Sequence, residues 1–166
     1  MIQQTVNYQK RKRYKMLLEV KVKKIRPGAK VPSFGSLEAA GADLYACLAD
    51  SDCPAIEIKP HQTVKIPLGF QTEFAPGYAA MLYARGGTAT KKGLAPANKV
   101  GVIDSDYRGE WIAAMHNHSD KTVLIEDGER IAQILFQEIE HPTFVEVDEL
   151  SDTERGEGGF GSTGTK

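Results

Sequence analysis

The stretch Gly101-Val102-Ile103-Asp104-Ser105-Asp106-Tyr107-Arg108-Gly109-Glu110 is the most informative part of this 166-residue chain. Val102 and Ile103 are β-branched and apolar, so they are expected on a buried strand. Asp104 follows directly, and a polar turn then leads into a second apolar run. A carboxylate where a strand becomes a hairpin has a fixed backbone and partial shielding from water, which suits a general base. The alternative is that Asp104 and Asp106 only stabilise a turn.

Short apolar runs separated by turn residues recur along the rest of the chain. From Leu18 to Ile25 apolar and charged residues alternate, as in a half-buried strand. Further runs occupy Ile56–Ile58, Val64–Leu68, Tyr78–Tyr83, Trp111–Met115, Val123–Ile125, Ile131–Phe136 and Phe144–Val147. One short helix is expected near Thr88–Lys92. Many short strands with regular turn signals predict an all-β sandwich or barrel.

Size, charge and cysteine content exclude several classes of protein. A chain of 166 residues forms one domain, and its net charge of −1 creates no field that attracts nucleic acid or an anionic membrane. No apolar run approaches membrane length, and no signal peptide is apparent. Cys47 and Cys53 are the only cysteines, and neither has a histidine at metal-ligand spacing, so free thiols are expected. We therefore expect a soluble cytoplasmic protein that binds neither nucleic acid nor membranes.

The histidines form no recognisable metal motif. His116 and His118 are separated by one residue and could face the same side of a strand, where they could bind a metal. No third ligand accompanies them in the sequence, so they are interpreted as surface or turn residues. His61 and His141 lie next to prolines in loops and receive the same interpretation.

Both ends of the chain differ from its middle. Residues 1–15 are polar and include the basic cluster Lys10-Arg11-Lys12-Arg13, which predicts a disordered extension or a tag. Residues 148–166 are first acidic and then rich in glycine, which makes up five of the nine residues from Gly156 to Gly164. Such a segment has little to bury and high conformational entropy, so it is expected to be mobile until a ligand holds it.

Four further motifs accompany the decapeptide, in a fixed order. They are Ala40-Gly41-Ala42-Asp43-Leu44-Tyr45-Ala46, Arg85-Gly86-Gly87 with Lys92-Gly93-Leu94, Gly128-Glu129-Arg130-Ile131-Ala132-Gln133-Ile134-Leu135-Phe136, and Arg155-Gly156-Glu157-Gly158-Gly159-Phe160-Gly161-Ser162-Thr163-Gly164. From about Met16 to the C-terminus, the chain resembles the trimeric deoxyuridine triphosphatases (dUTPases). The resemblance implies a jelly-roll-like β-domain over 16–147, a flexible Gly-rich C-terminal arm over 148–166, and a homotrimer with shared active sites. It also implies Mg²⁺-dependent hydrolysis of dUTP to dUMP and pyrophosphate.

The resemblance assigns the decapeptide to the nucleoside and to the attacking water. Asp104 would polarise the water that attacks the α-phosphorus. The Asn98 amide and backbone groups up to Val102 and Ile103 would read the uracil edge, because cytosine would leave such buried groups mispaired. Tyr107 would lie under the deoxyribose and exclude a 2′-hydroxyl. Without the motif, Tyr107 would be interpreted as an aromatic residue packed at a strand end.

The same resemblance assigns the phosphates to two other motifs. Arg85, Gly86 and Gly87 would wrap the phosphates, because a guanidinium binds phosphate oxygens in a bidentate way and glycine amides approach an anion closely. Gln133 would bind near the α-phosphate or its ordered waters. Arg130 is instead expected to pair with an acidic neighbour.

A metal site and a closing arm complete the assignment. Asp43 would hold Mg²⁺ through water, since Mg²⁺ keeps its waters and prefers substrate phosphates as inner ligands. Arg155 and the arm would close over the nucleotide, with Phe160 stacked on the uracil. The γ-phosphate would be held by the tail residues that follow, namely Gly161, Ser162 and Thr163.

One position departs from the family pattern. Where such motifs read Arg-Ser-Gly or Arg-Ser-Ser, this chain has Gly86 and lacks a hydroxyl that would donate to the bridging oxygen of the leaving pyrophosphate. Turnover is therefore expected to be weakened. Two alternatives stay open: a dUTP-binding regulatory or interaction protein with little catalysis, and a deoxycytidine triphosphate deaminase. The intact decapeptide and the Gly-rich tail favour dUTP as ligand over the deaminase.

Overall fold

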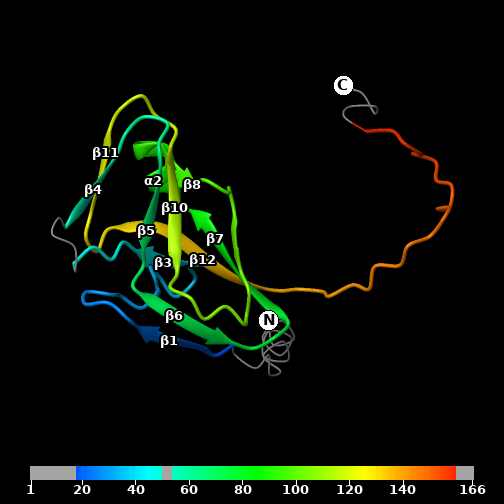
Figure 1. Cartoon of the computed structure of the whole chain (residues 1–166), viewed down its shortest axis with the longest axis horizontal. Helices are drawn as coiled ribbons and strands as arrows, with labels where there is room; N and C mark the ends of the chain where they lie inside the picture. The colour runs from blue at the N-terminus through cyan, green and yellow to red at the C-terminus, as the bar shows by residue number, and fades with distance from the viewer. Residues whose placement is uncertain (1–17, 50–53, 160–166) are drawn as a thin grey trace, which may run out of the picture.

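The computed structural model describes residues 18–49 and 54–159. Within this part the regular structure consists of short antiparallel strands and one short helix, joined by turns and loops (Figure 1). The strands are β1 (Val20–Lys24), β2 (Ser33–Phe34), β3 (Ala42–Tyr45), β4 (Ala55–Ile58), β5 (Thr63–Pro67), β6 (Phe70–Phe74), β7 (Tyr78–Ala84), β8 (Leu94–Pro96), β9 (Gly101–Ile103), β10 (Ile112–Asn117), β11 (Val123–Glu126) and β12 (Arg130–Glu138). The helix α2 (Gly86–Lys92) follows β7. The predicted all-β, jelly-roll-like fold is confirmed.

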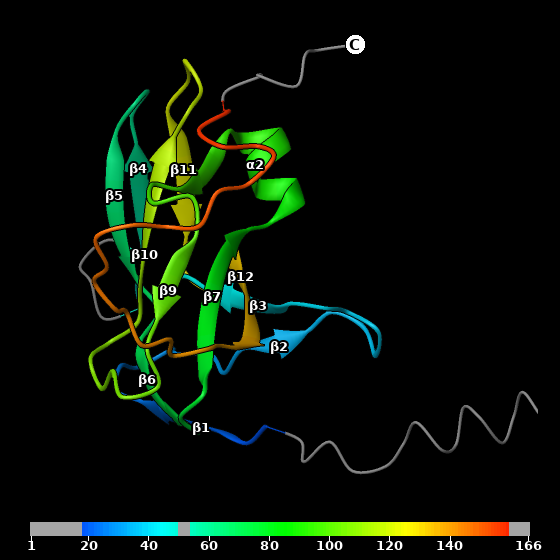
Figure 2. The same ribbon diagram turned by 90° about the vertical axis from the view of Figure 1, so that its right-hand side faces the viewer.

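The largest sheet has five strands in the order β2-β3-β12-β7-β9. A three-stranded sheet, β5-β10-β8, and the pairs β4-β11 and β1-β6 complete the body, and every pairing is antiparallel. Figure 2 shows β4, β5, β10 and β11 together on one side, with β7, β9 and α2 on the other. The strand β9 ends its sheet, so one of its two edges carries no strand partner within the described chain.

The core fills the space between these sheets. The apolar residues that alternate along the strands point inward and are fully buried, as in Ile66 of β5, Met115 of β10 and Ile134 of β12. Trp111 and Phe70 pack with ring centroids 5.2 Å apart. Burial of this kind is the main stabilising contribution to a fold with so little helix.

The short helix begins two residues before its predicted start, at Gly86. Arg85 stands at its N-cap with an extended backbone and makes no side-chain cap. Gly93 ends it with φ of 68°, and its N–H donates to the carbonyl of Thr88. A Cβ at Gly93 would approach Ser119 Cβ to 2.9 Å, so both backbone conformation and space require glycine there.

Seven of the eight strands predicted from apolar runs are present, and the strand predicted at Val102 and Ile103 is β9. The strand predicted at Phe144–Val147 is wrong, because these residues form no strand and Phe144 is 91% exposed. A strand needs a neighbour to pair with, and the arm runs clear of its own body. The sequence patterns also missed β2, β3, β6 and β8, three of which have four residues or fewer.

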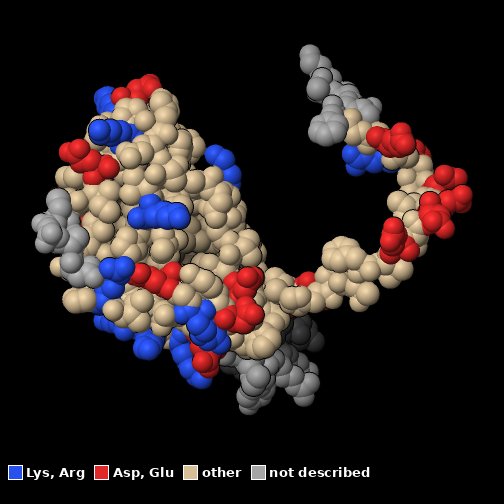
Figure 3. Space-filling model, in the orientation of Figure 1, with Lys and Arg blue, Asp and Glu red and all other residues tan. Residues whose placement is uncertain are grey.

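After β12 the chain leaves the body as an extended arm (Figure 1). The Ile139 N–H still donates to Gly77, but the hydrogen bonds within 140–159 are local, such as that from the Gly156 N–H to Thr153. Acidic side chains line this arm (Figure 3). Residues 1–15, the predicted basic extension, lie outside the described residues. Among the described residues no helix is long and apolar enough to cross a membrane.

Candidate active site

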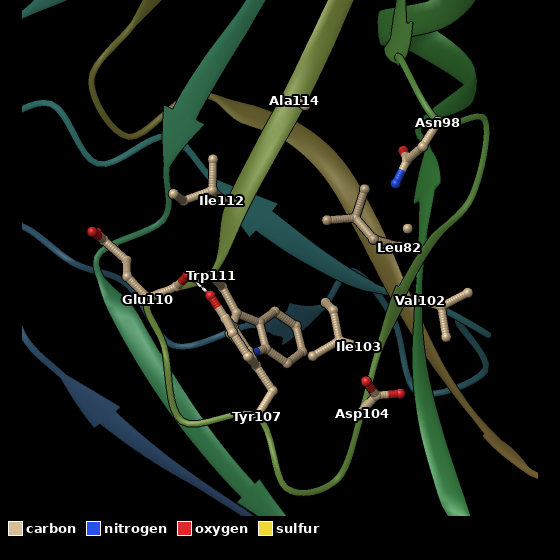
Figure 4. A pocket seen from close by; sticks show the side chains of 11 residues that line it. Leu82, Asn98, Val102, Ile103, Asp104, Tyr107, Glu110, Trp111, Ile112 and Ala114 are labelled. Carbon is tan, nitrogen blue, oxygen red and sulfur yellow. Dashed lines mark hydrogen bonds between the residues drawn. The ribbon is translucent and has the colours of Figure 1, made fainter.

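A pocket of about 240 Å³ lies between β9 and β10. Five of the predicted site residues line it, and they are Asn98, Val102, Ile103, Asp104 and Tyr107. Figure 4 shows them on β9 and on the loops at its two ends, with Trp111, Ile112 and Ala114 on the opposite side. Leu82 of β7 and Gly101 lie beneath. The decapeptide therefore forms one continuous pocket rather than an isolated turn.

The strand β9 presents its free edge to this pocket. Its other edge pairs with β7, where Ile103 faces Ala80 and Gly101 faces Leu82. A free edge carries unpaired N–H and C=O groups, which can bind a planar base as they would bind another strand. The Asn98 amide nitrogen is 3.4 Å from where a Cβ on Gly101 would lie, so this amide stands beside the same edge.

Two expectations for this strand are wrong in the single chain. Val102 is 61% exposed rather than buried, because side chains alternate along β9: the Ile103 side chain points toward Trp111, and the Val102 side chain points to the other face of the strand, although the residue borders the pocket (Figure 4). Asp104 is exposed rather than shielded, because it ends an edge strand that no other part of the described chain covers. The turn is nevertheless ordered, since the Tyr107 N–H donates to the Asp104 carbonyl over 3.2 Å.

A second cluster forms around Asp43, where β3, β7 and β12 meet. Asp43 is 8% exposed. Its Oδ1 accepts a hydrogen bond of 2.6 Å from Arg85 Nε, and its Oδ2 accepts one of 3.1 Å from Arg130 Nη1. The expectation that Arg130 pairs with an acidic neighbour is confirmed. Arg85, predicted to bind phosphate, is held by the same carboxylate.

The remaining phosphate-motif residues surround this cluster. Gly86 and Gly87 form the exposed first turn of α2, directly after Arg85. Gln133 lies on β12 opposite Asp43 on β3, and its Nε2 donates to the carbonyl of Ala84 over 2.9 Å. The structure thus brings Asp43, Arg85 and Gln133 together at one end of the five-stranded sheet.

Asp104 and Arg85 lie at opposite ends of β7. Ile103 faces Ala80, so Asp104 comes next to the start of β7, whereas Arg85 follows its last residue. The five residue-to-residue steps from Ala80 to Arg85 span about 17 Å at roughly 3.4 Å per step. None of Asp43, Arg85, Gly86, Gly87 or Gln133 lines the pocket that holds Asp104. One chain alone does not bring the predicted base and the predicted phosphate ligands to one point.

Up to residue 159, where the described part of the chain ends, the arm makes no hydrogen bond to either group. Arg155 is exposed, and its Nε donates to the carbonyl of Gly158 within a local turn. The other predicted arm residues lie outside the described residues, namely Phe160, Gly161, Ser162 and Thr163. Their assigned roles stay predictions.

Glu110 and Trp111 are among the pocket residues that the sequence analysis did not assign to the site. Glu110 lines the pocket, and its carboxylate binds Arg26 through Nε–Oε1 of 2.5 Å and Nη2–Oε2 of 2.9 Å. Trp111 is 2% exposed and lines the pocket between Glu110 and Ile112. The ion pair joins residues 84 positions apart, so no local pattern signals it. For Trp111 a signal was available in the sequence, because it is an isolated tryptophan at the start of an apolar run.

His116 and His118 at the end of β10 belong to no cluster of metal ligands among the described residues. The His116 and His118 rings pack with centroids 4.5 Å apart, and His116 Nδ1 bonds Thr63 Oγ1 at 2.9 Å. Desolvation, followed by the charges of His116, Lys99 and His61, lowers the pKa of His118. Within the described chain no group of three or more His, Cys, Asp or Glu side chains is arranged to hold a metal ion.

Comparison with known proteins identifies the family. The dUTPase family model matches residues 28–164, which contain both groups of site residues and the arm. The chain belongs to the dUTPase family. The deoxyuridine 5′-triphosphate nucleotidohydrolase of a Hydrogenobaculum species is 42% identical over 149 residues, covering 90% of this chain and all of the relative. That of Desulfitobacterium hafniense is 44% identical over 150 residues, covering 89% and 97%.

Solved dUTPase structures share the fold. A mutant of the Staphylococcus bacteriophage 80alpha dUTPase with dUpNHpp has a TM-score of 0.77 at 25% identity, covering 88% of this chain and 98% of that one. Another structure of the phage 80alpha dUTPase with dUPNHPP has a TM-score of 0.73 at 25% identity, with the same coverage. Its description states that phage dUTPases control transfer of virulence genes.

Proposed function

We propose that this dUTPase family member hydrolyses dUTP to dUMP and pyrophosphate at sites built from more than one copy of the chain. The observation that carries the proposal is the pocket between β9 and β10, where Asp104 and Tyr107 meet a free strand edge. Enzymes named for this reaction match nearly the whole chain. The residue roles below are our proposal.

The free edge of β9 recognises uracil. Its unpaired backbone groups and the Asn98 amide offer donors and acceptors at fixed positions, which complement the uracil edge and mismatch that of cytosine. A mispaired buried group costs about 1–3 kcal/mol. The tight hairpin that follows β9 is also proposed to leave no space for the extra methyl group of thymine. Tyr107 lines the same pocket from the loop that follows β9, where we propose that it packs under the deoxyribose (Figure 4).

Asp104 acts as the general base. Its carboxylate accepts a proton from water, the water oxygen bonds to the α-phosphorus, and the bond from that phosphorus to the α,β-bridging oxygen breaks. Pyrophosphate leaves with the electron pair of that bond. The exposure of Asp104 in one chain implies that a neighbouring copy or the arm covers it, because a base works best where water is limited.

A homotrimer, as the resemblance to dUTPases implied, would bring the two groups of residues together between neighbouring subunits. Arg85 at the far end of β7 cannot reach phosphates bound beside Asp104 of the same chain, since about 17 Å of strand separates them. A neighbour's Arg85, Gly86, Gly87 and Gln133 can supply that contact. The arm leaves its own body with Phe144 and Leu150 91% and 87% exposed, which suits a segment that packs on a neighbouring subunit.

The residues around Asp43 fit Mg²⁺ held through water. A carboxylate has about four acceptor positions, and two arginine hydrogen bonds leave room for a water. The described residues offer no cage of protein ligands, which agrees with an ion bound mainly by phosphates and water. When bound, Mg²⁺ neutralises phosphate charge. Asp43 orients Arg85 toward the same phosphates, and Gln133 holds their ordered waters.

A second candidate function is nucleotide-dependent regulation with slow turnover. Two observations favour it: Gly86 lacks the hydroxyl expected in the phosphate loop, and the phage 80alpha structures resemble this chain. In this case dUTP binding would matter more than its hydrolysis.

One assay separates these functions. Pyrophosphate, ammonia and nucleotide affinity are measured with dUTP, dCTP and dTTP in Mg²⁺. We expect pyrophosphate from dUTP alone. Tight dUTP binding without pyrophosphate would favour the regulatory function, and ammonia from dCTP would identify a deaminase and contradict the proposal.

A further inference from the structure

The Tyr107 ring is folded back over its own turn. Its hydroxyl donates to the backbone carbonyl of Glu110 over 3.1 Å, as the dashed line in Figure 4 marks. Its backbone N–H donates to the carbonyl of Asp104. The side chain is nonetheless 45% exposed, so packing by the core alone does not hold it. Contacts inside the turn therefore determine where the ring lies.

Gly109 provides the space for this ring. A Cβ at Gly109 would lie 2.2 Å from Tyr107 Oη, 2.4 Å from Cζ and 2.8 Å from Cε2. Gly109 does not have a positive φ, so its backbone conformation is open to alanine. The requirement for glycine at this position is steric and comes from the Tyr107 ring.

Glu110, whose carbonyl receives the Tyr107 hydroxyl, is itself held from a distant part of the chain. Its carboxylate makes the bidentate pair with Arg26, and its Oε1 also accepts the Gly69 N–H at 3.2 Å. The Glu110 side chain is only 17% exposed. Bidentate guanidinium–carboxylate pairs fix orientation as well as distance. The Arg26–Glu110 pair thus restrains the backbone on which Tyr107 rests.

We propose that Gly109 and the Arg26–Glu110 pair are positioning residues that fix the Tyr107 ring and thereby set selectivity for a 2′-deoxy sugar. The inference rests on the proposed function, in which Tyr107 packs under the sugar. Excluding one hydroxyl requires a surface that does not yield, because a ring free to shift by about an ångström can accommodate the extra oxygen. Gly109 allows the ring its position, and Arg26–Glu110 keeps the acceptor in place.

The test compares Gly109→Ala with Gly35→Ala as a matched control. Gly35 also lacks a positive φ, and a Cβ there meets nothing within 4 Å. The measured quantity is the ratio of kcat/KM for dUTP to that for UTP. We expect Gly109→Ala to lower this ratio roughly 10- to 100-fold, a size typical of an ångström-scale displacement, and Gly35→Ala to leave it unchanged. Arg26→Met should lower the ratio in the same direction.

A double variant distinguishes positioning from general damage. Once Tyr107→Ala has removed the ring, Gly109→Ala has nothing left to displace, so adding it should not lower the ratio further. A loss of stability alone would reduce activity on both nucleotides and leave the ratio constant. An unchanged ratio in Gly109→Ala, or an equal further drop in the Tyr107→Ala background, would overturn the proposal.

Binding measurements keep this inference separate from the proposed function. Calorimetry gives the Kd values of dUMP and UMP for the wild type and for Gly109→Ala without any turnover. Preference for dUMP in the wild type that weakens about tenfold in the variant supports positioning even if dUTP is not hydrolysed. If Gly109→Ala keeps the wild-type preference for dUMP over UMP, Gly109 does not position Tyr107, even if hydrolysis is fast.

Discussion

Arg85 donates a hydrogen bond of 2.6 Å from Nε to Oδ1 of Asp43, so the cation proposed to bind phosphate is already oriented by a carboxylate of its own chain. A guanidinium has five N–H donors, which lets it serve a carboxylate and a phosphate together. The pairing explains why Asp43 of one motif and Arg85 of another lie at the same end of the five-stranded sheet. Asp43 therefore orients Arg85 in addition to the role proposed for it at the metal ion.

Asp43→Asn should weaken both the fold and the use of Mg²⁺. The amide keeps the shape but removes the charge that Arg85 and Arg130 share, and we expect a stability loss of about 1–3 kcal/mol. The Mg²⁺ concentration for half-maximal turnover should rise. Glu73→Gln, which breaks the exposed Lys21–Glu73 pair, is the control and should change neither quantity. If Asp43→Asn needs the same Mg²⁺ concentration for half-maximal turnover as the wild type, Asp43 is not part of the metal site.

Asp104→Asn should keep nucleotide affinity and lose nearly all hydrolysis. The amide can still form hydrogen bonds but cannot accept a proton from water, and general-base catalysis contributes ~10²–10⁴-fold. Trp111 is the only tryptophan and lines the pocket, so its fluorescence can report dUTP binding in both proteins. Full activity in Asp104→Asn would show that another group activates the water.

Deletion of Gly156 to Lys166 should leave assembly intact and abolish most turnover. The Gly-rich segment carries Phe160, which is proposed to stack on uracil, and Ser162 and Thr163, which are proposed to bind the γ-phosphate. Light scattering measures the assembly, and pyrophosphate release measures the rate. If the truncated protein works at the full-length rate, the arm has no part in catalysis.

Gly86→Ser should raise kcat for dUTP while changing Kd only modestly. A Cβ at Gly86 meets no atom within 4 Å and its φ is not positive, so serine fits the loop without strain. A hydroxyl aimed at the bridging oxygen gains strength as charge develops there, and one such donor is worth roughly 10²–10³-fold in rate. A water that already donates the same bond would leave kcat equal in the two proteins, which single-turnover rates would reveal.

The sequence predicted the strands and the pocket better than the environment of each residue. Periodicity located β7, β10 and β12 because their apolar residues alternate over several positions. The resemblance to dUTPases assigned Asn98, Ile103 and Tyr107 to one nucleoside site, and these residues do line one pocket. They can be recognised from the sequence because they lie close together along the chain.

The burial of individual residues and the contacts between distant residues were harder to predict from the sequence. The exposure of Val102 and Asp104 follows from β9 being an edge strand, which depends on the whole sheet order rather than on local sequence. The Arg26–Glu110 pair joins distant loops, and the strand predicted at Phe144–Val147 has no neighbour in one chain. When the residues that contact a side chain are distant in the sequence, the sequence around that side chain does not predict its burial or its partners.

The shared active site is tested most directly by mixing two inactive variants. Asp104→Asn and Arg85→Ala are each assayed alone, then denatured together, refolded at equal amounts and assayed again. If Asp104 and Arg85 of one site come from different subunits, about a quarter of the sites in randomly mixed assemblies regain both residues and dUTP hydrolysis returns to about that fraction of wild type. Mixed assemblies that form, as mass spectrometry would show, yet release pyrophosphate no faster than the separate variants would contradict the account.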